Sequence, residues 1–134
     1  MDTRKRKTRR FPKEFRQVAN YIKEQKGIDV VLGEDTDYRG PFTREIVIHH
    51  NYDLRNNGLY ILLFECGKTF QSPIEDYNSK WDVRTWNMNM YYRDFTSWKT
   101  GWEIAQELNL DVNFIYYAQY RNDYLLKYFS DKLN

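Results

Sequence analysis

The stretch that decides the fold of this chain reads Tyr60-Ile61-Leu62-Leu63-Phe64-Glu65-Cys66-Gly67-Lys68-Thr69-Phe70-Gln71. Its apolar run predicts a helix over about residues 59–70. The residues before it, 51–58, are polar and end in Asn57-Gly58, which is typical of a connecting link. Residues 42–50 centre on Ile46-Val47-Ile48 and predict a strand. The sequence therefore predicts a strand that leads through a short link into this helix.

The rest of the chain predicts an α+β domain with a small sheet. A first helix opens at Phe11-Pro12, where proline costs no hydrogen bond, and ends at Gly27. In chain order we then expect a short strand over 28–32, the strand and helix above, a long irregular aromatic segment over 71–93, a helix capped by Asp94 and running through Leu108, and a last helix over 112–132.

Length and composition indicate one soluble intracellular domain. A chain of 134 residues is long enough for a single core without further staples. No apolar run approaches the roughly eighteen residues of a membrane helix, and the basic N-terminus is not followed by an apolar segment. We therefore expect neither a membrane anchor nor a signal peptide. The single cysteine excludes an internal disulfide framework, which suits a reducing compartment.

The charges are distributed unevenly. Eight of the 21 basic residues but only two of the 19 acidic residues lie within residues 1–16, so a basic arm precedes a mildly acidic remainder. We expect residues 1–10 to be a flexible arm and residues 11–134 to be the folded domain. The arm residues expected to bind nucleic acid or an acidic partner are Arg4, Lys5, Arg6, Lys7, Arg9 and Arg10. A merely solubilising tail is the alternative.

The segment Phe64-Glu65-Cys66-Gly67-Lys68 resembles the H-E-x-x-H motif of zinc metallopeptidases with both histidines replaced. The stretches Thr43-Arg44-Glu45-Ile46-Val47-Ile48 and Asp94-Phe95-Thr96-Ser97-Trp98-Lys99-Thr100-Gly101-Trp102-Glu103-Ile104-Ala105 look like the edge strand and downstream helix of the same enzymes. Together they resemble small phage-encoded metallopeptidases related to the ImmA/IrrE and SprT-like zincins.

This resemblance implies a zincin-like fold that has lost its metal. Phe64 and Lys68 would occupy the two zinc-ligand positions, Glu65 the general-base position and Asp94 the position of a third ligand. Phenylalanine has no lone pair and a lysine ammonium has no acceptor, so neither binds zinc. We therefore expect no catalytic residue, no metal and no cofactor, and a bacteriophage pseudoenzyme in the host cytoplasm or the virion.

Three alternatives stay open at this stage. One is a nucleic-acid-binding accessory protein that uses the basic arm, and the other two concern the motif helix. The helix could be a plain amphipathic core helix with Leu62, Leu63 and Cys66 inward. An active hydrolase could instead use a non-standard site, for which His50, Cys66 and Asp94 are weak metal candidates beside Glu65 and Lys68. His49 and His50 are adjacent on the expected strand, so we predict that they point to opposite faces and that His50 faces the helix.

Aromatic side chains supply the candidate protein-binding surface. Phe, Tyr and Trp make up 18% of the chain, and such residues dominate interface hot spots. In the irregular segment the candidates are Trp81, Trp86, Tyr91 and Tyr92. The last helix carries two apolar stripes, of which one is available for a partner or a homodimer. The sequence thus predicts a catalytically inactive binding or inhibitory module that acts on a host or phage protein.

Overall fold

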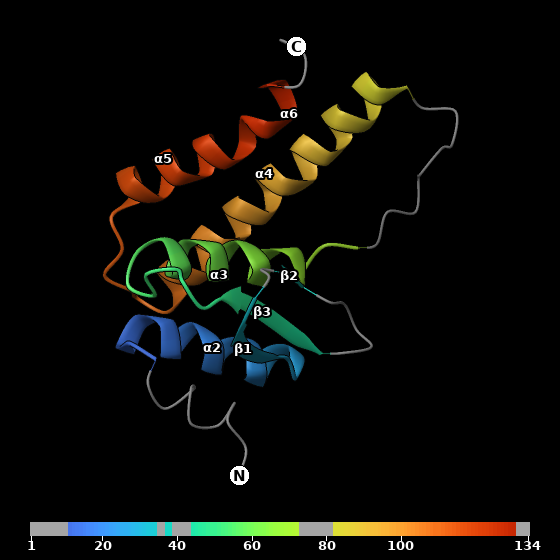
Figure 1. The fold of residues 1–134 in the computed structure, drawn as a ribbon. Coiled ribbons are helices and arrows are strands. Elements are labelled where there is room, and N and C mark those ends of the chain that lie inside the picture. The colour runs from blue at the N-terminus through green and yellow to red at the C-terminus, as the bar shows by residue number, and fades with distance from the viewer. Residues whose placement is uncertain (1–10, 35–36, 39–43, 73–81, 131–134) are drawn as a thin grey trace.

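The computed structural model describes residues 11–34, 37–38, 44–72 and 82–130, so the predicted basic arm and Trp81 lie outside the described residues. In chain order the elements are α2 (Lys13–Lys26), β1 (Asp29–Gly33), β2 (Asp37–Tyr38), β3 (Glu45–His49), α3 (Asn57–Lys68), α4 (Val83–Glu107), α5 (Phe114–Leu125) and α6 (Lys127–Ser130). This combination of helices with a small sheet confirms the predicted α+β class (Figure 1).

The three described strands form one sheet in the order β1-β3-β2. β1 runs parallel to the central strand β3, and β2 runs antiparallel to it. Ile46, Val47 and Ile48 of β3 are all buried, which explains the continuous apolar run of this strand. The register pairs Gly33 with His49, so β1 and β3 end at the same edge of the sheet.

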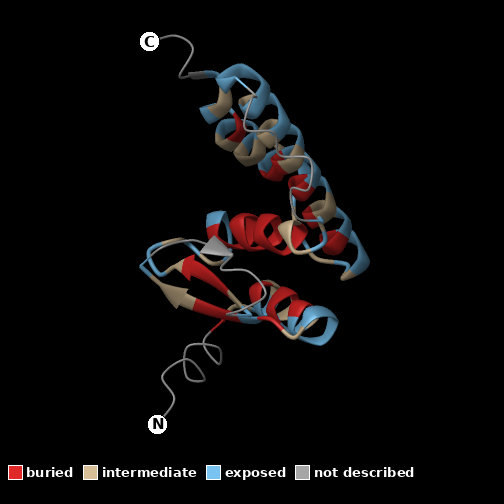
Figure 2. Ribbon diagram, turned by 90° about the vertical axis from the view of Figure 1, so that its right-hand side faces the viewer, coloured by how far each residue is buried: buried red, intermediate tan, exposed pale blue. Residues whose placement is uncertain are grey.

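Helix α3 lies in the middle of the molecule. It contacts α2 and β3 on one side and α4 on the other (Figures 1 and 2). Every residue from 58 to 67 is buried, so α3 has no solvent-facing stripe along most of its length. A helix that is apolar almost all round is stable only when other elements surround it. The quoted sequence stretch is therefore the core around which the domain is built.

Glycines bring α3 and α4 into close contact. A methyl carbon added at Gly67 would lie 2.0 Å from the carbonyl oxygen of Ser97, and one added at Gly101 would lie 2.6 Å from the carbonyl oxygen of Leu63. Both distances are far below a van der Waals contact, so any larger residue would force the two helices apart. The absence of side chains at these two positions fixes how closely α4 packs on α3.

The predicted irregular segment over 71–93 is wrong for residues 83–93, which belong to α4. This helix has 25 residues and begins after Asp82, whose side chain accepts a hydrogen bond from the Thr85 amide at 2.7 Å. Asp94 is therefore not a cap. It lies on the buried stripe of α4 with Ser97, Trp98 and Gly101, at the helical spacing of three and four residues. Asp82 and Asp94 are both suitable N-cap residues, and the packing of α4 against α3 favours a helix that begins after Asp82.

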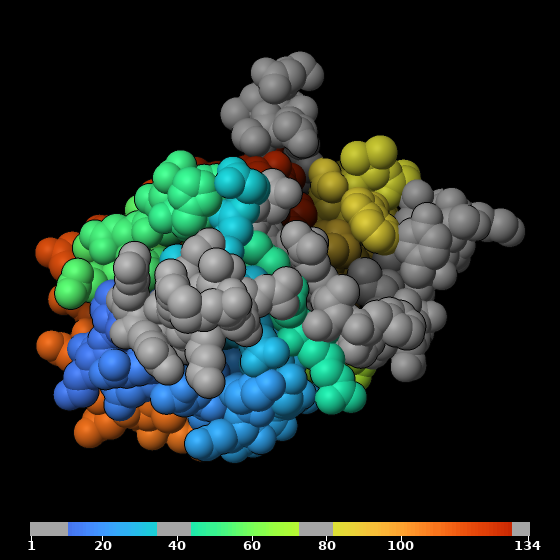
Figure 3. Space-filling view, turned by 60° about the horizontal axis from the view of Figure 1, so that its bottom comes forward, coloured from blue at the N-terminus to red at the C-terminus, as the bar shows by residue number. Residues whose placement is uncertain are grey.

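The predicted last helix is divided in two. The Asn113 side chain caps α5 by accepting a hydrogen bond from the Ile115 amide at 2.8 Å, and Leu126 separates α5 from α6. Helices α4, α5 and α6 form an arm that extends away from the sheet and α2 (Figures 1 and 2). Figure 3 views the molecule from the side of α2, which is blue. In this view the first turns of α4, in yellow, lie apart from α2. None of the described helices is long and apolar enough to cross a membrane.

Candidate functional site

The Phe64 side chain is fully buried inside an aromatic cluster. Its ring stacks on the ring of Trp98 from α4, with centroids 4.5 Å apart and an interplanar angle of 17°. The ring of Tyr124 from α5 packs against it at 4.9 Å. The first predicted ligand position therefore holds three helices together through apolar contact and offers no atom that could bind a metal.

Glu65 and Lys68, one helical turn apart on α3, form an ion pair. Lys68 Nζ donates a hydrogen bond to Glu65 Oε1 at 3.3 Å. Glu65 is only 3% exposed, and the ammonium of Lys68 also lies over the ring of Phe64 at 4.8 Å from its centroid. A positive charge thus stabilises a carboxylate that burial alone would strongly disfavour. Of the two buried carboxylates near this site, Glu65 and Asp94, it is Glu65 that Lys68 pairs with.

Asp94 faces the same region from α4 and is also buried. The hydroxyl of Tyr128 donates a hydrogen bond to Asp94 Oδ2, and Lys127 Nζ lies 3.8 Å from the same oxygen. Burial and then the bond to Asp94 raise the pKa of Tyr128 well above its usual value. Burial lowers the pKa of Lys127, although the Asp94 charge opposes that effect. Two residues of α6 therefore bind the Asp94 carboxylate, and this contact was not predicted from the sequence.

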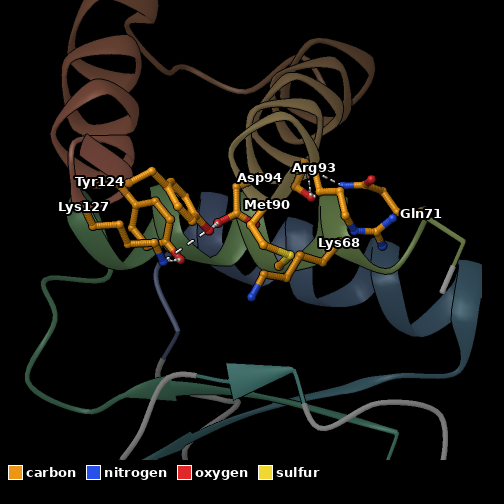
Figure 4. A pocket seen from close by; sticks show the side chains of 9 residues that line it. Lys68, Gln71, Met90, Arg93, Asp94, Tyr124 and Lys127 are labelled. Atoms are coloured by element: carbon orange, nitrogen blue, oxygen red, sulfur yellow. Dashed lines mark hydrogen bonds and ion pairs between the residues drawn. The ribbon is translucent and has the colours of Figure 1, made fainter. Parts of the chain in front are cut away.

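These groups surround a cavity of about 270 Å³ between α3, α4 and the C-terminal helices (Figure 4). Its walls are Lys68, Gln71, Met90, Arg93, Asp94, Ser97, Tyr124, Lys127 and Tyr128. Gln71 Nε2 donates to the carbonyl oxygen of Arg93 and to Ser97 Oγ, both at 2.5 Å, and so ties the end of α3 to α4. The described walls carry three cationic side chains and one carboxylate, with Glu65 paired to Lys68.

The residues of this cavity do not fit a zinc ion. Catalytic zinc sites keep three protein ligands, usually imidazoles and carboxylates. Here the two carboxylates are bound to lysine ammonium groups, and Phe64 and Lys68 supply no lone pair. The arrangement is a network of charges and phenols that joins four helices, and the described residues of the cavity do not supply the donor set of a metal-dependent hydrolase.

Cys66 is no better suited to chemistry. Its side chain is completely buried, and burial followed by the charge of Glu65 raises the pKa of its thiol far above the usual value. A thiol that stays protonated is neither a nucleophile nor a metal ligand. Cys66 therefore serves as a small apolar residue of the core.

The prediction that His50 faces the motif helix is wrong. His50 follows the end of β3, where the alternation of a strand no longer applies, and it is exposed beside Glu34. The prediction that His49 and His50 point to opposite faces is also wrong, because their rings stack with centroids 4.8 Å apart. Glu34 had no signal in the sequence, since only the parallel pairing of β1 and β3 brings it to the histidines.

Of the predicted protein-binding residues, Trp86, Tyr91 and Tyr92 lie in the first half of α4. Tyr92 is 60% exposed and Trp86 is 36% exposed. Tyr91 is partly buried, and its ring packs against the ring of Phe129 of α6 with centroids 5.3 Å apart. A small cavity of about 120 Å³ opens here between α4 and α6. The contribution of α6 was not predicted, because it depends on how the C-terminal helices pack back against α4.

No protein-family model, curated protein or solved structure matches this chain.

Proposed function

We propose that this domain is a catalytically inactive metallopeptidase-like protein that acts by binding a host or phage protein. The observation that carries the proposal is the ion pair between Lys68 and Glu65 over the Phe64 ring. In the frame that the sequence resembles, this is the place of the zinc ion and the carboxylate that activates its water. An ammonium there supplies positive charge and structural support without a Lewis acid.

The same network supports a structural role for the former site. Asp94, Lys127 and Tyr128 join α4 to α6, and Lys68 of α3, which is paired with Glu65, lines the same cavity. Buried charges need partners, so this network specifies how the helices dock rather than what they cleave. A site whose charged groups already stabilise one another has little capacity left for a reacting substrate.

The binding surface that we propose is the helical tip, defined as the exposed side chains Trp86, Met88, Tyr92, Phe95 and Phe129. These residues lie on the first half of α4 and on α6, and the first turns of α4 and α6 lie at the end of the helical arm away from the sheet (Figure 1). Tryptophan and tyrosine anchors of this kind carry most of the energy of protein interfaces. The basic arm of residues 1–10 would add electrostatic attraction.

Peptidase assays with added zinc test the loss of catalysis. The purified protein should not cleave an unfolded protein substrate such as casein, with or without zinc. Zinc-dependent cleavage that disappears in Glu65→Gln would overturn the inactive assignment. Cleavage that survives Glu65→Gln and persists through repeated purification would indicate a hydrolase site that does not use Glu65, and it would also overturn the inactive assignment.

Comparative affinity capture from infected and uninfected host cells tests the binding role. The double variant Trp86→Ala/Tyr92→Ala should lose a partner that the unchanged protein retains. Tyr116→Ala is the matched control, because Tyr116 is 61% exposed but lies at the start of α5, remote from the helical tip. A partner lost equally with the control, or retained by the tip variant, would contradict this surface. Deleting residues 1–10 should weaken capture mainly at low salt.

A further inference from the structure

The ends of β1 and β3 create a second cluster of chemically active side chains, separate from the cavity of Lys68 and Asp94. Gly33 pairs with His49, and the His50 amide donates to the Gly33 carbonyl oxygen at 2.9 Å. The backbone therefore holds the residue after Gly33, which is Glu34, beside the two histidines. Main-chain hydrogen bonds therefore fix the position of these three residues relative to one another.

The three side chains converge. His50 Nε2 lies 3.4 Å from Glu34 Oε1, and the imidazole rings of His49 and His50 stack at 4.8 Å with an angle of 19°. One nitrogen or oxygen atom from each of the three residues lies within 4.8 Å of the other two. All three side chains are at least partly accessible, so a solvated ion can reach them.

We propose that Glu34, His49 and His50 form a surface site for a divalent transition metal of the zinc class. Tetrahedral zinc with bonds of about 2.0–2.2 Å places its ligand atoms about 3.3–3.6 Å apart. The His50–Glu34 distance already meets this requirement. The third ligand atom has to move inward by at most about 1.5 Å, which accessible side chains reach by small rotations.

The donor set determines the class of metal. Two imidazoles and one carboxylate match the three protein ligands of open zinc sites, with water in the fourth position. Imidazole favours zinc, nickel and copper, whereas magnesium and calcium prefer oxygen ligands throughout. The site should therefore select transition metals against the alkaline-earth ions. Metal bound there would link the end of β1 to the residues after β3.

Binding has one structural consequence that can be observed. The Asn51 amide donates a hydrogen bond to His49 Nδ1 at 3.1 Å. Coordination through Nδ1 needs the same lone pair, and coordination through Nε2 moves the ring proton to Nδ1. In both cases the Asn51 bond has to open, so the amide of Asn51 should respond to the metal.

The test is a zinc titration of the full-length chain without an affinity tag. Calorimetry should detect one ion per chain, and the Asn51 amide resonance should shift with the same stoichiometry. Calcium or magnesium at equal concentration should leave that resonance unchanged. His50→Ala and Glu34→Gln should each weaken zinc binding by at least about 100-fold, because even outer-shell partners of a metal change affinity 10–100-fold.

Glu24→Gln, which removes an exposed carboxylate of α2, is the control and should bind zinc unchanged. No stoichiometric binding at millimolar zinc would overturn the proposal, and so would binding that survives both site variants. The proposed protein-binding function does not depend on this site. The peptidase and capture experiments therefore fail or succeed independently of the zinc titration.

Discussion

Replacing Lys68 by methionine isolates the charge of the Lys68–Glu65 pair. Methionine keeps the length and apolar contacts of the side chain while removing the ammonium, so packing changes little. The variant leaves the Glu65 carboxylate, 3% exposed, without this ion pair. A buried charge that loses its counter-ion is destabilising in proportion to how fully the pair is removed from water.

The expected loss follows from the burial of the two partners. Breaking a fully buried pair costs about 3–5 kcal/mol, and an exposed pair is worth about 0–1 kcal/mol. Here the carboxylate is buried but the Lys68 side chain is 32% exposed, so we expect Lys68→Met to reduce the free energy of unfolding by about 2 kcal/mol. Urea denaturation followed by circular dichroism would measure this difference.

The control is Lys23→Met. Lys23 Nζ lies only 2.9 Å from Asp29 Oδ1, but both side chains are more than half exposed, so the loss should stay below about 0.5 kcal/mol. Adding Glu65→Gln to Lys68→Met should recover most of the stability, since the carboxylate that lost its counter-ion is then replaced by a neutral amide. If Lys68→Met costs no more than Lys23→Met, the ammonium does not stabilise Glu65 and the proposed substitute for the metal charge is refuted.

Three further predictions concern the helix contact, the start of α4 and alkaline stability. Gly67→Ala should cost about 3 kcal/mol, because its methyl carbon would lie 2.0 Å from the Ser97 carbonyl oxygen; Gly58→Ala, with its nearest atom at 3.0 Å, should cost less in the same urea titration. Asp82→Ala should cost about 1 kcal/mol and speed amide exchange in the first turn of α4, since the bond from the Thr85 amide is lost; unchanged exchange would contradict this helix start. Burial raises the pKa of several tyrosines, namely Tyr60, Tyr117, Tyr120 (to about 12), Tyr124 and Tyr128. These phenols ionise near pH 10 in the unfolded chain, so their stabilisation is complete below about pH 10 and is lost as the pH rises toward about 12. The Tm should therefore fall between about pH 10 and about pH 12, and a constant Tm over that range would contradict the burial of these hydroxyls.

The candidate site was only partly predictable, because some of its contacts join residues that lie far apart in the sequence. Glu65 and Lys68 are three residues apart on one helix, so their contact follows once the helix is assigned. Asp94 and Tyr128 are separated by 34 positions, and their bond exists only because α6 returns to α4. The stacking of His49 on His50 likewise depends on the exact residue at which β3 ends.

The sequence alone predicts the elements that have strong local signals. Pro12 and Gly27 bound α2, the apolar run of Ile46, Val47 and Ile48 makes the central strand, and the quoted stretch makes α3. It also determined that Phe64 and Lys68 offer no lone pair to a metal, since this is a property of the side chains alone.

The choice of the aspartate that caps α4, and the groups that gather around Asp94, depend on how the helices pack. Local propensity gives Asp82 and Asp94 similar capping signals, and the choice depends on which residues α4 presents to α3. That contact is set by the close approach at Gly67 and Gly101, where two backbones nearly touch. Packing between segments distant in sequence therefore decides what local hydrogen bonding leaves undetermined.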